Sequence, residues 1–252
     1  MNGRAGDKPR RLSPLVALVP AVLAPVAALL ARGLPSRIPL TLLATLAVYP
    51  VMAALLLRGR RAAALLAVLL WAASLSASVI GLTRRDPGSM QGVVINGPDY
   101  RDEMFAFIRE GAGRESDPAR FVPEHLLHLS LFGLLAGGTG GLLGMALGAV
   151  MVGYMSFYVG ALAAAGGDPG IALLLGWPPW AILRVVGFVI IGVGLTEPLL
   201  GVAARRFGWA ISERGSYKAW YLAAALLLVT DMVLKALLAP AWAGFLRPCL
   251  GS

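Results

Sequence analysis

Long apolar stretches fill most of this chain, and short polar segments separate them. A helix that crosses the hydrocarbon core of a bilayer, about 30 Å thick, needs roughly 20 apolar residues. The pattern therefore predicts an all-α, polytopic integral membrane helix bundle. The apolar stretches of about this length or more are 15–31, 38–57, 62–82, 126–165, 181–204 and 221–238.

The stretch 126–165 is too long for one span. It contains no Asp, Glu, Lys or Arg, and as a single helix it would be about 60 Å long, twice the bilayer core. The run Gly137-Gly138-Thr139-Gly140-Gly141 interrupts it, and each glycine costs about 1 kcal/mol in a helix interior. We therefore predict helices over 123–137 and 141–164 with a turn between them. The total becomes about seven spans, or six if the short helix 123–137 does not cross.

One polar segment, 83–122, is long enough to have a structure of its own. It divides the chain into an N-terminal three-span unit, 1–82, the extramembrane segment itself, and a C-terminal membrane unit of about four spans, 123–252. Within the segment, Tyr100, Met104 and Ile108 recur at helical spacing and predict a short amphipathic helix that stops at Gly111. Such a helix is either a lid or docking element on the membrane surface or one that packs on the bundle.

The charge distribution agrees with a membrane protein. The 252 residues are 58% hydrophobic and 14% charged, whereas soluble domains carry about 25% charged residues. Basic residues gather in 1–13, 58–61 and 204–218, as is typical of cytoplasmic loops. This favours a cytoplasmic N-terminus and a periplasmic or external segment 83–122, although the pair Arg84-Arg85 favours the opposite orientation. The excess of arginine over lysine favours a bacterial origin, and hence the inner (plasma) membrane.

The net charge of +9 does not indicate nucleic-acid binding, because no basic stripe is interleaved with aromatic residues. The expected contact of the basic clusters is instead with the lipid bilayer and its anionic head groups. The single cysteine excludes a disulfide framework and a cysteine-based metal cluster.

Both histidines of the chain lie in Glu124-His125-Leu126-Leu127-His128. On a helix, Glu124, His125 and His128 can share one face, and two imidazoles with a carboxylate can bind a divalent metal. They are therefore candidate metal ligands, and no other cofactor is predicted. The alternative is that the glutamate stabilises a helix N-terminus while the histidines are hydrated at the membrane interface.

Four ionisable residues interrupt the later apolar stretches, and each costs about 2.5–3.5 kcal/mol at a bilayer centre. Asp231 and Lys235 are four residues apart and are expected to neutralise each other. Arg184 is expected to extend toward the interface. Glu197, a buried carboxylate before Pro198, has no partner nearby in the sequence and is the strongest single functional candidate. Its alternative role is a structural ion pair with another helix.

The predicted turn at 137–141 places the starts of two later spans on one side of the membrane. A candidate functional polar cluster then forms near the face that carries 83–122, while Glu197 lies nearer the opposite face. Two polar layers at different depths are typical of a translocation path, or of two separate structural ion pairs. The cluster consists of Glu124, His125, His128, Arg184 and Asp231.

Glycines spaced by four residues predict close helix packing, either within the chain or with a second copy or other subunits of a membrane complex. These positions are Gly133, Gly137 and Gly141, and Gly140, Gly144 and Gly148.

The leading functional hypothesis is a small permease, or a subunit of a membrane complex, that uses buried polar residues. The alternative is a membrane-embedded enzyme, metal- or histidine-dependent and acting on lipid or peptide, centred on Glu124, His125 and His128. An enzyme is the less favoured of the two, because the chain has no Walker A, GxSxG, HExxH or Rossmann glycine motif. A receptor or assembly role through 83–122 comes third.

Overall fold

The computed structural model describes residues 14–34, 36–209 and 216–251. The predicted N-terminal basic cluster, 1–13, and Arg214 lie outside these residues. Every regular element within them is a helix, as predicted. In chain order these are η1 (Pro14–Leu18), α1 (Val19–Arg32), α2 (Ile38–Leu57), α3 (Arg61–Arg85), α4 (Pro87–Gln91), α5 (Gly97–Glu110), α6 (Pro118–Gly138), α7 (Leu142–Ala163), α8 (Pro169–Leu175), α9 (Pro179–Arg206), α10 (Lys218–Leu246) and η2 (Arg247–Leu250).

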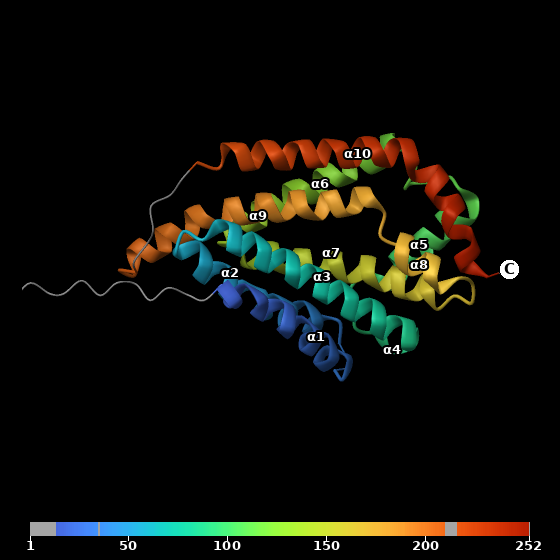
Figure 1. Ribbon diagram of the computed structural model, residues 1–252, viewed down its shortest axis with the longest axis horizontal. Helices are drawn as coiled ribbons and strands as arrows, with labels where there is room; N and C mark the ends of the chain where they lie inside the picture. The colour runs from blue at the N-terminus through green and yellow to red at the C-terminus, as the bar shows by residue number, and fades with distance from the viewer. Residues whose placement is uncertain (1–13, 35, 210–215, 252) are drawn as a thin grey trace, which may run out of the picture.

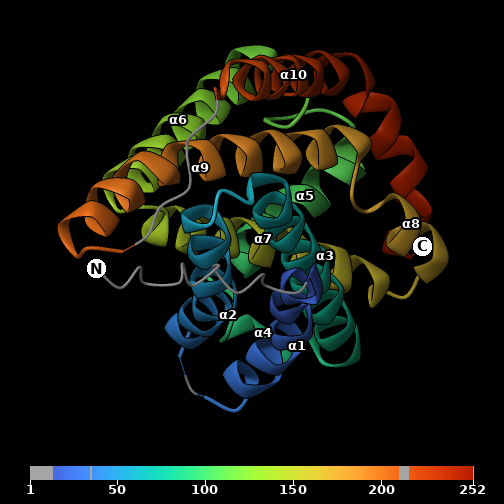
Figure 2. The ribbon, with the colours of Figure 1, turned by 60° about the vertical axis from the view of Figure 1, so that its left-hand side comes forward.

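The long helices lie side by side along the molecule, and the chain reverses direction at each connection between them (Figure 1). Helix α7 is central, since it contacts α2, α3, α5, α6 and α8. Helix α10 lies on the outside against α9 (Figure 2). We call the end that bears Arg58, Arg60, Arg61, Arg205 and Arg206 the arginine-rich end, because its described loops carry no Asp or Glu. The opposite end, where α4, α5 and α8 lie and where arginines are mixed with acidic residues, is the α5 end.

Six helices in the described part of the chain are long and apolar enough to cross a membrane: α1 with η1, α2, α3, α7, α9 and α10. Helix α6 runs between the same two ends (Figure 1) but does not belong to this set. Its first half carries Glu124, His125 and His128, which lower its hydropathy. Seven spans are therefore not confirmed, and six are supported. Many large apolar side chains on these helices face outward, Leu226 and Leu237 of α10 among them, which is consistent with contact with a bilayer.

The glycine-rich turn between two helices is confirmed. Helix α6 ends at Gly138 and α7 begins at Leu142. Gly140 and Gly141 between them have φ of +60° and +91°, in the left-handed region that glycine adopts without strain. This turn lets α6 and α7 run antiparallel.

The predicted amphipathic helix is also confirmed, as α5. Its buried side chains are Met104, Phe107 and Ile108, which pack in one apolar cluster with Tyr158 of α7. It therefore packs on the bundle, the second of the two interpretations. It ends as predicted at Gly111, whose φ is +71°.

The glycines spaced by four contact other residues of this same chain. A side chain added at Gly144 of α7 would place its Cβ 2.8 Å from the Cβ of Ala136 on α6. Gly160 of α7 lies even more tightly against α3, where an added Cβ would be 2.7 Å from the carbonyl oxygen of Ile80. Close packing within the chain thus uses these small residues, and association with a second copy stays a prediction.

Replacing Gly160 by alanine is expected to lower the free energy of unfolding by about 1–3 kcal/mol, the usual cost of overpacking. The clash is with backbone, so α3 and α7 have to separate. The matched control is Gly81→Ala on α3, where nothing lies within 4 Å of the added Cβ and the change is neutral or stabilising by up to about 1 kcal/mol. Unfolding in mixed micelles measures both variants, and equal stabilities would contradict the packing described.

Candidate functional site

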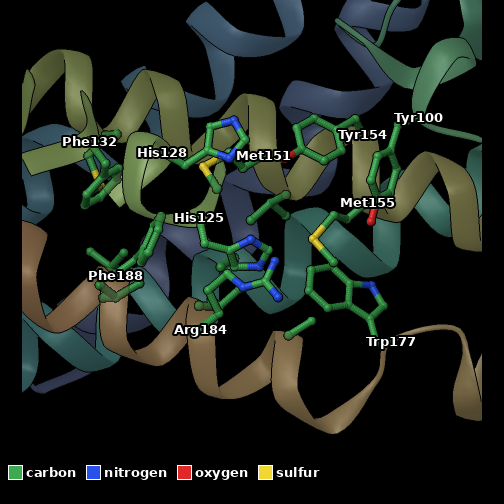
Figure 3. Close-up of a pocket in the computed structure, with 18 of the residues that line it drawn as sticks. Tyr100, His125, His128, Phe132, Met151, Tyr154, Met155, Trp177, Arg184 and Phe188 are labelled. Atoms are coloured by element: carbon green, nitrogen blue, oxygen red, sulfur yellow. The ribbon is translucent and has the colours of Figure 1, made fainter. Parts of the chain in front are cut away.

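A cavity lies within the bundle between α3, α6, α7 and α9, and Tyr100 of α5 also lines it (Figure 3). The space between its side chains, open mouth included, is about 900 Å³, and about 80 Å³ of it is wide enough for the centre of a water molecule. A larger ligand therefore requires side chains to move. Three methionines, whose flexible side chains adapt readily, line it: Met145, Met151 and Met155.

Arg184 of α9 provides the fixed charge of the cavity. Its Nε and Nη2 each donate a hydrogen bond of 2.9 Å to the Asp231 carboxylate on α10, and the aspartate side chain is 1% exposed. The expectation that Arg184 extends to the interface is therefore wrong, because a bidentate partner holds it inside the bundle. The pair joins α9 to α10 and keeps the guanidinium at the cavity wall.

Lys235 does not pair with Asp231, which corrects the prediction from their spacing. Its ammonium lies 2.8 Å from the carboxylate of Glu115, in the connection before α6, and 4.6 Å from the ring centroid of Phe121. Asp231 already accepts both bonds from Arg184, so the lysine takes its partner from another segment. Glu115 also lines the cavity.

Glu124, His125 and His128 all line the cavity, but their side chains are not grouped as metal ligands. In the described residues, no three or more His, Cys, Asp or Glu side chains are arranged to hold a metal ion. The Glu124 carboxylate instead lies 3.0 Å from Nε of Arg114. A metal at this position has no support from the side-chain arrangement.

His125 presents a hydrogen-bond acceptor to the cavity. Its Nδ1 is 2.7 Å from the carbonyl oxygen of Phe121. Because a carbonyl only accepts, Nδ1 carries the proton and Nε2 of the neutral ring keeps a free lone pair. Nε2 is buried and has no hydrogen-bond partner. Figure 3 places this imidazole beside Arg184, at the centre of the cavity.

Two indoles add hydrogen-bond donors to the cavity wall. The Nε1 atoms of Trp71 and Trp177 are buried and have no partner, and both side chains line the cavity. An indole N–H can only donate, and a buried unsatisfied polar group costs about 1–3 kcal/mol. The cavity therefore offers two donors and one acceptor to a ligand.

The inner end of the cavity is apolar. Phe132 of α6 and Phe188 of α9 lie with ring centroids 5.3 Å apart, and Figure 3 shows them on the side away from Tyr100 and Trp177. On the α5 side, Tyr100 of α5 packs on Tyr154 of α7 with centroids 4.7 Å apart. The cavity is thus polar toward the α5 end and apolar toward the middle of the bundle.

The cavity residue Glu115 also affects α5, which lies outside the spans. Burial raises the pKa of the Glu103 carboxyl above its ordinary value, and the neighbouring Glu115 carboxylate raises it further. Arg114 opposes this shift. Helix α5 therefore has a carboxyl group that takes up a proton more readily than an exposed glutamate does.

Glu197 lies in a second polar group nearer the arginine-rich end. Its carboxylate accepts bonds of 2.7 and 2.9 Å from Nε and Nη2 of Arg61, the first residue of α3. The Tyr217 hydroxyl also donates to it, and the Arg61 guanidinium lies 4.0 Å from the Tyr217 ring centroid. The candidate residue thus has a partner on another helix. We call Arg61, Glu197 and Tyr217 the ionic lock, because it joins α3, α9 and the start of α10.

The structure therefore brings Glu124, His125, His128 and Arg184 to one cavity, with Asp231 holding the arginine. Sequence reasoning missed Trp71, Trp177 and Glu115, which are ordinary residues of a span, a loop and a polar segment. A charge inside a span with no partner nearby in the sequence does indicate a partner on another segment, but the sequence does not identify that partner.

Comparison with family models, with curated proteins and with solved structures finds no match to this chain. The six apolar helices indicate a membrane protein. The intramembrane cavity is the feature that carries a functional proposal.

Proposed function

We propose that this protein is a small permease whose binding site is the cavity. The observation that carries the proposal is a cavity inside the bundle that holds a fixed ion pair and three hydrogen-bonding groups without partners, those of Trp71, Trp177 and His125. Such groups are costly unless a ligand or water satisfies them. The expected ligand is a small amphiphile, because one end of the cavity is polar and the other is aromatic.

The two polar groups support movement of that ligand across the membrane. The cavity is polar toward the α5 end, while Phe132, Phe188 and the ionic lock lie between it and the arginine-rich end. A permease needs a site that is reached from one side while the other is closed. On this proposal the structure is the state closed at the arginine-rich end, and a bacterial inner membrane with the arginine-rich end in the cytoplasm is the expected setting.

A bulky side chain introduced into the cavity is expected to prevent ligand binding. Monooctanoylglycerol is a suitable probe, since its hydroxyls can donate to His125 and its ester carbonyl can accept from an indole. Gly148 lines the cavity, and the leucine side chain of Gly148→Leu is expected to fill it. The backbone tolerates the change, because an added Cβ meets only Phe132, at 3.8 Å. Native mass spectrometry of the intact protein is expected to show one bound probe, reduced at least tenfold by Gly148→Leu.

The matched control is Gly244→Leu on the exposed face of α10, where nothing lies within 4 Å of the added Cβ. It is expected to leave probe binding unchanged. Equal loss in both variants, or no binding to the unaltered protein, would contradict the cavity as the binding site.

A second candidate function is a hydrolase, which one observation favours. The free lone pair on Nε2 of His125 could act as a general base on a water molecule in the cavity. The same spectra separate the two functions. A permease leaves the probe mass intact, whereas a hydrolase adds water across the ester and releases octanoic acid and glycerol, a reaction that His125→Phe would stop.

A further inference from the structure

A second, wider groove runs along the outside of the bundle between α3 and α9. About 380 Å³ of it admits the centre of a water molecule, and its lining is almost wholly apolar. Small residues of α3 form its base, and Ala73 and Ala77 among them are exposed. The side chains that define it are Leu69, Ala73, Ala77 and Ile80 of α3 with Ile182 and Val186 of α9.

This groove adjoins the cavity. Four residues line both spaces: Ala72, Val152, Trp177 and Val185. Trp177 therefore lies at the junction, and its buried Nε1–H has no partner. Only these shared side chains thus separate an apolar groove on the outer surface of the bundle from a polar interior, and one of them carries an unused hydrogen-bond donor.

The groove has the length of one lipid chain. Leu69 and Ile80 are eleven residues apart on α3, which at 1.5 Å per residue is about 16 Å. Half of a hydrocarbon core about 30 Å thick is about 15 Å, the depth that a chain occupies in one leaflet. Because α3 runs from the arginine-rich end to the α5 end, the groove lies in the middle of the bundle and toward the α5 end, like the cavity.

We infer that the ligand is a single-chain lipid that enters sideways from the bilayer, with its hydrocarbon chain in the groove and its head group in the cavity. This inference rests on the proposed function and specifies its substrate class. The head group is uncharged or zwitterionic, with a hydroxyl donor and a carbonyl acceptor, because Arg184 and Lys235 are already paired with carboxylates. His125 accepts from the hydroxyl, and Trp177 donates to the carbonyl at the junction.

A transmembrane helix of a second copy is the rival occupant. Ala73 and Ala77 are four residues apart, a spacing that also suits helix association. The wall that the groove shares with the cavity favours the lipid, because a helix packed on the groove would leave the Trp177 donor and the cavity behind it unused.

The test uses the full chain in phosphatidylcholine nanodiscs with a monopalmitoylglycerol that carries a photoactivatable diazirine at its chain end. Irradiation is expected to label the groove, residues 69–80 and 182–186, and excess unlabelled monopalmitoylglycerol is expected to remove this label. Ala77→Phe, which fills the groove, is expected to reduce it at least fivefold. Ala62→Phe, exposed on the same helix but outside the groove, is the matched control and leaves the labelling unchanged.

Binding of the shorter monooctanoylglycerol tests the cavity alone, so it distinguishes failure of the inference from failure of the proposed function. Ala77→Phe is expected to retain it, because an eight-carbon chain is short enough to lie inside the cavity toward Phe132 and Phe188, and this retention also shows that the variant is folded. Groove labelling that the competitor does not reduce, and that equals labelling at exposed Leu226 of α10, would overturn the inference while the cavity site stood. A dimer in native spectra that Ala77→Phe abolishes would overturn it in favour of a second copy. Failure of the short probe to bind the unaltered protein would instead overturn the proposed function.

Discussion

Removing the charge of Asp231 is expected to lower the free energy of unfolding by about 3–5 kcal/mol, since a buried ion pair that loses one partner leaves an uncompensated charge. The aspartate is 1% exposed and accepts two bonds from Arg184. The single variants Asp231→Val and Arg184→Met are both expected to show a loss of this size. Reversible unfolding in mixed micelles measures it.

The double variant Arg184→Met/Asp231→Val is expected to recover most of the lost stability, because no charge remains to be buried. The double variant also tests whether the Arg184–Asp231 pair contributes to ligand binding in the cavity. If Arg184 binds ligand, the double variant is stable and yet binds monooctanoylglycerol at least tenfold more weakly. A stable double variant with unchanged binding would assign the pair to structure alone, and two costs that simply add would contradict the coupling.

The membrane class and the order of helices could be predicted from the sequence, because both depend on the length of apolar stretches and on local glycine chemistry. The turn at Gly140-Gly141 and the stop of α5 at Gly111 are of this kind. Each follows from a backbone conformation that glycine adopts most easily. Helix α6 was harder to classify, because Glu124, His125 and His128 reduce its apolar character although it runs with the other helices.

Charge partners could not be predicted from the sequence, because they depend on which helices are neighbours. Asp231 and Lys235 have favourable helical spacing, but each finds a better partner elsewhere. Glu197 pairs with Arg61, which is 136 positions away in the chain. Local spacing identifies only one of several possible ion-pair partners. A buried charge is stabilised most by a partner that offers bidentate hydrogen bonds, as Arg184 does for Asp231.

Replacing Glu197 by glutamine is expected to open the arginine-rich end. The change removes the charge that holds two nitrogens of Arg61, and the side chains of this pair are only 14% and 7% exposed. If the closed state loses about 2 kcal/mol of stabilisation relative to the open state, the open fraction rises roughly thirtyfold. Tyr217→Phe removes one hydrogen bond and leaves the ion pair, so its effect is smaller.

Accessibility of the cavity from each face tests the central claim most directly. Cys249 is the only cysteine and is buried, so Cys249→Ala provides a background in which His128→Cys reports on the cavity and exposed Arg58→Cys reports on the arginine-rich face. In vesicles of known orientation, a membrane-impermeant maleimide is expected to label His128→Cys from the α5 face. From the arginine-rich face, labelling is expected to be slow and to rise roughly thirtyfold with Glu197→Gln. Labelling from the α5 face alone, with or without Glu197→Gln and while Arg58→Cys reacts normally, would contradict a permease.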